Sequence, residues 1–299
     1  MSAAKTILIT GTSSGFGLSA AVYLTSQGHQ VIATMRDLNK QDALFAKLRQ
    51  HKVSQPLKIL PLDVTDHKSI ADCQQQLDQA YGGLDVLINN AGFAIAGFFV
   101  DLTEKDIRDQ MEVNFFGAQN VTRAMLPLLR ARRAATIINI SSISGLTAYP
   151  ALGAYNASKW ALEGYSESLY YELKPFGIRV ALIEPGSYKT KIFYENAHYA
   201  THFNNPFSPY YQVSQDLKIF MHKHLKPNHR DPVEIAKLIE KIINHPNSGL
   251  RHIPDWQNRT LILLRKILPF SVYSSIVYQI SSKGIGAWSQ LNKSANSSN

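Results

Sequence analysis

The sequence predicts an α/β fold in which helices cover both faces of one doubly wound parallel sheet. Short apolar runs alternate with helix-length segments six times between Thr6 and Ile183. Continuous apolar runs without polar alternation are typical of strands buried on both faces. A glycine-rich turn directly after the first run indicates a tight strand-to-helix connection. This topology places the ligand crevice at the carboxyl ends of the strands.

The elements follow in order along the chain. The expected strands are Thr6–Thr10, Val31–Thr34, Leu57–Leu62, Val86–Ile88, Thr136–Ile140 and Val180–Ile183. The expected helices are Phe16–Ser26, Ala43–Gln50, Ser69–Tyr81, Ile107–Leu129 and Tyr155–Leu173. No Pro/Gly/Ser linker divides the chain, so we expect one domain over residues 1–299. Within it we distinguish a core over 5–185, a lid over 186–230 and a helical C-terminal segment over 258–283.

Composition excludes several classes of protein. The chain has 299 residues, of which 45% are hydrophobic, enough for a buried core and too many for a disordered protein. Its single cysteine, Cys73, excludes an intrachain disulfide scaffold. The first ten residues lack a charged region and a cleavage site of the signal-peptide kind, so we expect a cytoplasmic protein.

The net charge of +9 is unevenly distributed. Residues up to Pro185 carry 17 basic and 16 acidic side chains, whereas the remainder carries 14 basic and 6 acidic ones. We find no helix-turn-helix, zinc-finger or aromatic RNA-binding pattern, so nucleic acid is not an expected partner. The basic excess is expected at the lid rim or in a tail facing a membrane surface.

The turn after the first strand has the spacing Gly-x-x-x-Gly-x-Gly and opens a helix. Glycines let backbone N–H groups approach a pyrophosphate, and the helix N-terminus adds partial positive charge. We therefore expect this turn to bind a dinucleotide through Gly11, Ser13, Ser14, Gly15, Phe16 and Gly17.

The residues after the second strand bear on the choice of cofactor. NAD-binding sites normally place an acidic residue here for the ribose 2′-OH, but this chain has Met35-Arg36. Arg36 can pair with a 2′-phosphate, which favours NADP(H), with NAD(H) as the alternative. Arg36 could instead form a surface ion pair with Asp37.

Polar and small residues also follow the next two strands. Asp63 and Val64 are expected to contact the cofactor: Asp63 could accept a hydrogen bond from an adenine amino group, or could cap its own loop. In Asn89-Asn90-Ala91-Gly92 we expect Asn89 to be structural. We expect Asn90, Ala91 and Gly92 to line the cofactor.

Tyr155 and Lys159 lie four residues apart at the start of a helix, so their side chains share one face. An ammonium group beside a phenol, together with an oxidised nicotinamide ring, favours the phenolate. Lowering a tyrosine pKa by about two to three units requires roughly 3–4 kcal/mol. Tyr155 would then act as a general acid and base near neutral pH.

With the glycine turn, Asn-Asn-Ala-Gly, and Ser142 ahead of Tyr155-x-x-x-Lys159, the chain resembles the short-chain dehydrogenase/reductase family. The resemblance covers Lys5 to about Thr190 and implies a Rossmann-like fold. It implies that Tyr155 donates the proton, Lys159 lowers its pKa and holds the nicotinamide ribose, and Ser142 polarises the substrate carbonyl. It also implies that Asn114 holds a water connecting Lys159 to solvent. Pro185, Gly186 and Thr190 match the segment that lies over the nicotinamide.

Further similarity is to the branch containing 17β-hydroxysteroid dehydrogenase type 1 and photoreceptor-type retinol dehydrogenases. The segments carrying it are Ala33–Leu38, Tyr155–Gly164 and Leu173–Gly177. It implies NADP(H)-dependent interconversion of a lipophilic ketone or aldehyde, ketosteroid-like or retinal-like, and its alcohol. One departure is Ser14, where many NADP-binding relatives have Lys or Arg. Alternatives are an NAD-dependent alcohol dehydrogenase, a fatty or polyketide ketoacyl reductase, and a non-catalytic cofactor-binding regulator.

The lid is rich in aromatic residues and histidines. Its aromatic residues could wall an apolar substrate cleft, with Leu146, Tyr149 and Leu152 opposite. These aromatics are Phe193, Tyr194, Tyr199, Phe203, Phe207, Tyr210 and Tyr211. Alternatively, they form the core of the lid or a subunit contact. His198 and His202 have helical i,i+4 spacing but lack the other features of a zinc site, so no metal is expected.

The C-terminal segment Leu261–Ile280 is apolar but contains Arg265, Lys266 and Pro269, which argues against a transmembrane helix. It could lie on an anionic membrane surface, dock on the domain or close the substrate cleft. The family resemblance implies a homodimer formed through the helices beginning near Ile107 and Tyr155.

Overall fold

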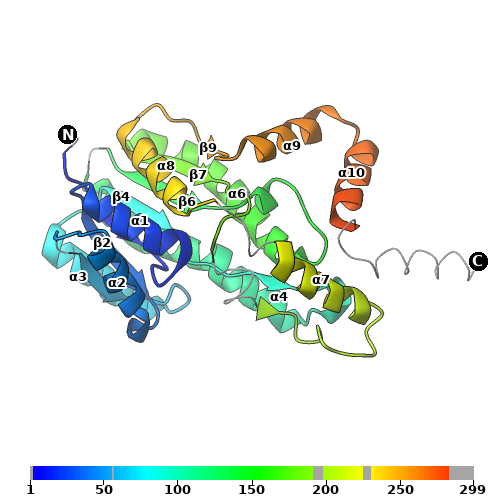
Figure 1. The fold of residues 1–299 in the computed structure, drawn as a ribbon. Helices are drawn as coiled ribbons and strands as arrows, with labels where there is room; N and C mark the ends of the chain where they lie inside the picture. Colours follow the sequence, from blue (N-terminus) through cyan, green and yellow to red (C-terminus); the bar gives the residue numbers. More distant parts are fainter. Residues whose placement is uncertain (1–2, 56, 133, 191–197, 225–229, 283–299) are drawn as a thin grey trace, which may run out of the picture.

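The computed structural model describes residues 3–55, 57–132, 134–190, 198–224 and 230–282. Its main sheet has the strand order β3-β2-β1-β4-β6-β7-β9, and every neighbouring pair is parallel (Figure 1). The doubly wound α/β prediction is confirmed. The strands are β1 (Thr6–Ile9), β2 (Gln30–Met35), β3 (Lys58–Pro61), β4 (Val86–Asn89), β6 (Thr136–Ile140), β7 (Arg179–Ile183) and β9 (Arg251–His252).

Two apolar clusters hold the helices on opposite faces of this sheet. One cluster joins α1 (Gly15–Ser26), α2 (Asp42–Gln50) and α8 (Val233–Asn244) to the strands. The other joins α3 (His67–Tyr81), α5 (Ala118–Arg130) and α6 (Gly153–Glu172) to them. Strands covered on both faces explain why the expected runs were continuously apolar.

The prediction of a single helix over Ile107–Leu129 is wrong in detail. The chain forms α4 (Glu104–Met111), a π-helical segment over Glu112–Gly117, and then α5. A capping box between Thr103 and Asp106 starts α4, three residues before the expected beginning. The π-helical segment contains Asn114, in agreement with the tendency of such segments to occur at functional sites.

The lid contains secondary structure that the sequence did not indicate. Its strand β8 (His198–Tyr199) pairs in parallel with β5 (Ile95–Ala96), and α7 (Tyr211–His224) follows. Ala200 and Phe203 pack with Ile95 in a small buried cluster, so part of the lid's aromatic content forms its own core. Short 3-10 turns complete the chain at Leu38–Lys40, Phe99–Asp101, Ile143–Gly145 and Lys174–Phe176.

The C-terminal segment expected over 258–283 consists of two helices, α9 (Trp256–Ile267) and α10 (Phe270–Ser282). They separate at Leu268 and Pro269, because Leu268 has an extended backbone that is typical of a residue before proline. Both helices extend from the body of the domain (Figure 1). No helix in the described ranges is both long and apolar enough to cross a bilayer.

Candidate active site

The glycine turn is shaped by close backbone approach. Gly11 has φ +70° and Gly15 has φ +58°, a region that favours glycine. A Cβ on Gly11 would lie 2.8 Å from the Ala91 Cα atom, and one on Gly17 would lie 2.4 Å from the Gly11 oxygen. No larger residue fits at either position without a shift of the backbone, and the turn leaves the N-terminus of α1 facing the strand ends.

The residues directly after β1 and β4, Thr10 and Asn90, tie this turn to the neighbouring loop. The Asn90 amide donates to the carbonyl oxygens of Thr10 and Gly11 at 2.8 and 2.9 Å. The Thr10 hydroxyl accepts from the backbone N–H groups of Asn90 and Ala91. Asn90 therefore braces the turn in addition to lining the cavity beside it.

Asn89 lies in a buried polar chain beneath the loop. Its Nδ2 atom donates to Thr122 Oγ1 at 2.9 Å and to Asn139 Oδ1 at 2.8 Å. Asn139 in turn donates to Ser166 Oγ at 2.8 Å. These bonds connect β4, β6, α5 and α6, so the structural role expected for Asn89 is confirmed.

At the far end of the cavity, Arg36 is exposed and lines the wall together with Lys40. The Asp37 carboxylate accepts from the Asn39 backbone N–H at 3.0 Å, and no ion pair joins it to Arg36 in the described part of the chain. Asp63 accepts from the backbone and hydroxyl of Thr65, so it caps its own loop while lining the cavity. The glycine cradle and these two cations fit a dinucleotide that carries phosphate groups.

At the other end, Ser142, Tyr155 and Lys159 come together. Ser142 follows β6 and accepts from the Ser144 backbone N–H at 3.1 Å, while Tyr155 and Lys159 are in the first two turns of α6. Lys159 Nζ lies 5.8 Å from the centroid of the Tyr155 ring and donates to the Ile140 carbonyl at 2.9 Å. All three side chains are buried and line the same cavity.

The electrostatics of these groups depend on their burial. Desolvation raises the pKa of Tyr155, whereas a hydrogen bond with Ser142 acts in the opposite direction. Desolvation also lowers the pKa of Lys159 to about 8, and the Glu163 carboxylate opposes this. In the protein without its cofactor, therefore, the pKa of Tyr155 is raised, and the lowering expected beside an oxidised nicotinamide ring stays a prediction.

Asn114 is buried beside this centre, and its amide is held by the protein. It exchanges two hydrogen bonds with the backbone of Phe93, each of 3.0 Å, and donates to Ser158 Oγ at 3.1 Å. Its side chain does not line the cavity. The water-holding role implied by the resemblance stays a prediction.

One cavity of about 1150 Å³ connects the two ends. It brings together most of the residues expected from sequence. These are Gly11, Ser13, Ser14, Gly15, Phe16, Arg36, Asp63, Val64, Asn90, Ala91, Gly92, Ser142, Tyr155, Lys159, Pro185, Gly186 and Thr190.

The profile of the short chain dehydrogenase family matches residues 5–199, which contain the glycine turn and all of Ser142, Tyr155 and Lys159. The chain belongs to the short-chain dehydrogenase family. It is an oxidoreductase of that type.

Named relatives extend the similarity beyond the matched segment. The chain is 42% identical to the uncharacterized oxidoreductase YusZ of Bacillus subtilis, over 91% of this chain and 97% of the relative. It is 35% identical to retinol dehydrogenase 8 of Bos taurus, over 89% and 86%. A 3-ketodihydrosphingosine reductase of Bacteroides thetaiotaomicron is 45% identical over 62% of this chain and 64% of its own length.

A solved short-chain dehydrogenase from Streptomyces avermitilis has the same fold. It is 31% identical to this chain, with a TM-score of 0.76, and the match covers 94% of this chain and 98% of that one. The similarity therefore extends through the C-terminal region as well as the core.

The substrate side of this short-chain dehydrogenase differs from the sequence expectation. Leu146, Tyr149 and Leu152 are not among the residues that line the cavity. Their segment is covered by α10, because the Tyr273 hydroxyl lies 2.6 Å from Thr147 Oγ1. Burial and Tyr273 together raise the pKa of Tyr149 to about 12. Phe193 and Tyr194 lie outside the described residues.

Other side chains form this part of the wall. Phe93 and Ile95 after β4 and His198 and Tyr199 in β8 line the cavity, and Phe93 packs edge-on against His198 with ring centroids 4.9 Å apart. Tyr199 is one of the lid aromatics that the sequence placed in the cleft wall, whereas Phe93, Ile95 and His198 were not expected there. The sequence gives no sign of the pairing of β8 with β5, which joins segments about one hundred residues apart.

His198 and His202 do not share a helix face, because His198 is in β8 and His202 is in the turn that follows. The His202 backbone N–H donates to the Asp101 carbonyl at 3.0 Å. Within the described ranges, no three His, Cys, Asp or Glu side chains are arranged to hold a metal ion.

Proposed function

We propose that this short-chain dehydrogenase uses NADP(H) to interconvert a lipophilic ketone or aldehyde and its alcohol, with Tyr155 as general acid and base. The observation that carries the proposal is the cavity joining Ser142, Tyr155 and Lys159 to the glycine cradle and Arg36. When bound, a nicotinamide cofactor supplies the hydride acceptor or donor and, in its oxidised form, a positive charge.

In carbonyl reduction, the Tyr155 hydroxyl donates its proton to the substrate oxygen, and Ser142 donates a hydrogen bond to the same oxygen. The backbone bond that Ser142 accepts from Ser144 fixes its oxygen, and its own proton, which interacts with Tyr155 in the protein without substrate, can turn to the substrate oxygen. Lys159, held by the Ile140 carbonyl, places its ammonium beside the phenol and stabilises the phenolate that forms. In alcohol oxidation the same phenolate accepts the proton.

The preference for NADP(H) is supported by Arg36 and Lys40 in the same wall of the cavity. A 2′-phosphate would form charge-assisted hydrogen bonds with such groups. The alternative, NAD(H), is supported by Asp37, which also lines the cavity and whose carboxylate could accept from a ribose 2′-OH.

The substrate class is supported by the aromatic and aliphatic wall formed by Phe93, Ile95 and Tyr199. Two relatives are named for reactions on lipophilic molecules, a retinol dehydrogenase and a ketodihydrosphingosine reductase. A fatty or polyketide ketoacyl reductase is the main alternative. The presence of Ser142, Tyr155 and Lys159 in one cavity argues against a non-catalytic regulator.

The test is a turnover screen of retinal, ketosteroids, long-chain ketones and medium-chain aldehydes with NADPH and with NADH. We expect reduction of at least one class with NADPH, and loss of that turnover in Tyr155→Phe. Full turnover by Tyr155→Phe would contradict the mechanism, and a clear preference for NADH would contradict the cofactor assignment.

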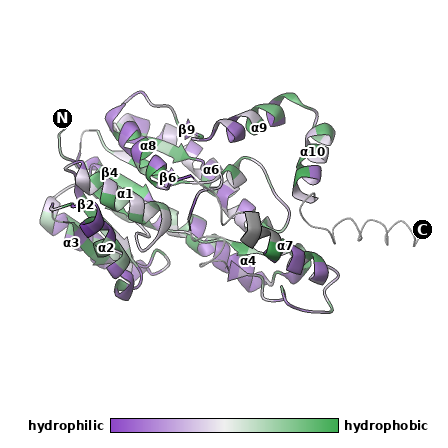
Figure 2. Cartoon of the chain, viewed as in Figure 1, coloured by the Kyte–Doolittle hydropathy of each residue, from purple (hydrophilic) through white to green (hydrophobic). Residues whose placement is uncertain are grey.

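We also propose that α9 and α10 contact an anionic membrane surface. Ile267 and Phe270 are 66% and 72% exposed, with exposed Arg259 and Lys266 nearby, and Figure 2 shows alternating apolar and polar residues on these helices. Flotation with anionic vesicles should recover the wild type and less of an Ile267→Ser, Phe270→Ser variant. Equal recovery of the two proteins would contradict the membrane contact.

We propose further that the protein forms a homodimer, as the family resemblance implies. A monomer in sedimentation velocity would contradict the dimer.

A further inference from the structure

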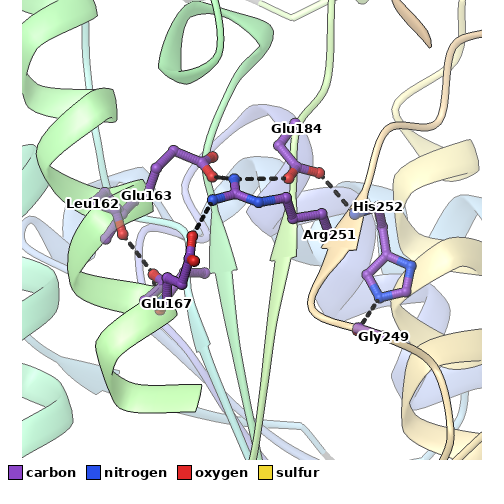
Figure 3. Close-up of polar contacts among 9 residues, drawn as sticks. Leu162, Glu163, Glu167, Glu184, Gly249, Arg251 and His252 are labelled. Carbon is purple, nitrogen blue, oxygen red and sulfur yellow. Dashed lines mark hydrogen bonds and ion pairs between the residues drawn. The ribbon is translucent and has the colours of Figure 1, made fainter. Parts of the chain in front are cut away.

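A largely buried group of charged side chains is formed by residues of α6, β9 and the segment after β7 (Figure 3). It consists of Glu163 on α6, Glu184 after β7 and Arg251 on β9, with Glu167 at its edge. Glu184 immediately precedes Pro185, and Glu163 follows Lys159 by one helical turn. The group is therefore attached to two of the segments that form the reaction centre.

Arg251 is the cation of this group. Its guanidinium pairs with Glu163, donates to Glu167 Oε2 at 2.9 Å and faces Glu184 Oε1 at 3.7 Å. Figure 3 shows the guanidinium between Glu163 and Glu184. Glu184 is held from its other side by the His252 backbone N–H at 2.7 Å. One arginine thus serves two buried carboxylates and one at the surface.

Burial makes these charges dependent on one another. Glu184 is fully buried and Glu163 is only 4% exposed. Desolvation is the main effect on both groups: it raises the pKa of Glu184 to about 8 and also raises that of Glu163. Arg251 acts against this on both groups, and the Ser141 hydroxyl and Lys159 also act against it on Glu163. Without the arginine, neither carboxylate would have a guanidinium partner.

Glu163 connects the group to the reaction centre. Glu163 and Lys159 share one face of α6, because residues four apart are neighbours on a helix. Gly145 packs against this stretch of α6, since a Cβ there would lie 2.8 Å from Glu163 Cγ and 3.1 Å from the backbone carbonyl oxygen of Lys159. The Glu163 carboxylate is the group that raises the pKa of Lys159 against the effect of burial.

We propose that Glu163 and Arg251 are positioning residues: Arg251 keeps the Glu163 carboxylate ionised inside the protein, and that carboxylate keeps Lys159 charged beside Tyr155. The inference rests on the proposed function, in which the Tyr155–Lys159 pair handles the proton. Arg251 lies outside residues 5–199, the part that matches the family profile, and reaches the site because β9 pairs with β7.

The decisive experiment titrates Lys159 itself in the full chain without cofactor. Lysines are labelled at ¹³Cε, and the Lys159 resonance is assigned by its loss in Lys159→Arg. We expect Glu163→Gln to lower the Lys159 titration midpoint by about one pH unit, because it removes a neighbouring opposite charge. Arg251→Met should also lower the Lys159 midpoint, and Arg251→Lys should lower it less.

Glu167→Gln is the matched control, since Glu167 also contacts Arg251 but its side chain is 47% exposed. We expect its Lys159 midpoint to equal that of the wild type. Thermal unfolding of each variant shows whether it is folded. If Arg251→Met does not fold, the Lys159 midpoints of Glu163→Gln and Arg251→Lys still test the proposal. An unchanged Lys159 midpoint in folded Glu163→Gln would overturn the proposal.

A second readout follows the reaction. In alcohol oxidation, the midpoint at which kcat rises should move to higher pH in Glu163→Gln, because a neutral Lys159 no longer stabilises the Tyr155 phenolate. A move to lower pH would overturn the proposal, since it would mean that Glu163 acts on Tyr155 directly. If the wild type turns over no alcohol or carbonyl, the proposed function fails, while the titration of Lys159 still decides this inference.

Discussion

The Asp255 carboxylate accepts a hydrogen bond of 2.8 Å from the backbone N–H of Gly186, which fastens the start of α9 to the segment after β7. The same oxygen accepts from the Asn258 amide at 2.9 Å, and the carboxylate pairs with Arg230. Asp255 is almost fully buried. The C-terminal third of the chain therefore holds one wall of the cofactor cavity in place.

Replacing Asp255 by alanine should leave the Gly186 N–H without its acceptor. We expect a loss of about 1–3 kcal/mol in the free energy of unfolding and weaker cofactor binding. Asp255→Asn keeps an acceptor oxygen and should bind cofactor more tightly than the alanine variant. Urea unfolding and quenching of protein fluorescence by NADPH measure the two effects; wild-type affinity in Asp255→Ala would contradict this role.

Tyr155→Phe removes the proton donor and keeps the ring. We expect kcat to fall by about 10²–10⁴-fold, because general acid catalysis contributes that much. Ser142→Ala should lower kcat by about 10²–10³-fold through loss of a hydrogen bond to the developing oxyanion. Tyr171→Phe, at an exposed position of the same helix, is the matched control and should have wild-type kcat.

Arg36→Ala tests the cofactor preference. We expect the KM for NADPH to rise by about 10-fold or more and the KM for NADH to change little, because only NADPH carries the 2′-phosphate. Arg49→Ala, at the exposed end of α2 and away from the cavity, should leave both values unchanged. Equal increases for both cofactors would remove the assignment to NADP(H).

Gly17→Ala places a methyl group 2.4 Å from both the Gly11 oxygen and the Asn90 amide nitrogen. We expect a loss of about 1–3 kcal/mol in the free energy of unfolding and a large loss of cofactor affinity. Gly164→Ala in α6 meets no atom within 4 Å and is the matched control. It should stabilise the protein by about 0.5–1 kcal/mol, since alanine is the better helix former.

Glu184→Gln should change how stability depends on pH. The folded-state pKa of Glu184 is raised from 4.5 to about 8, so the folded protein binds this proton more tightly than the unfolded chain. The stability that this group contributes is therefore present below pH 4.5 and is lost as the pH rises through about 8. The wild type should lose up to about 1.4 kcal/mol per pH unit in this window.

Glu184→Gln has no carboxyl group to titrate, so it lacks this loss of stability. The difference in free energy of unfolding between Glu184→Gln and the wild type should therefore grow from pH 5.5 to pH 7.5 in urea unfolding. Glu167→Gln, whose side chain is half exposed, should follow the wild type. A constant difference between Glu184→Gln and the wild type across this range would show that Glu184 does not titrate there.

The six main strands could be predicted because strands buried on both faces have continuous apolar sequences. The seventh, β9, could not, because Arg251 and His252 are polar and pair with β7 through only two residues. The helix expected over Ile107–Leu129 was periodic enough to predict, but its π-helical segment follows from packing and from the bonds that hold Asn114. Neither leaves a local sequence pattern.

By itself, the sequence determined the parallel sheet, the glycine turn and the Tyr155–Lys159 pair, since each depends on residues close together in the chain. Only the tertiary structure decided which residues face the substrate end of the cavity, and that α10 covers the segment containing Tyr149. It also decided that Arg251 reaches Glu163 and that Asp255 holds Gly186. These contacts join segments about seventy to ninety residues apart. The burial that desolvates their charged groups and shifts their pKa values exists only once the chain has folded.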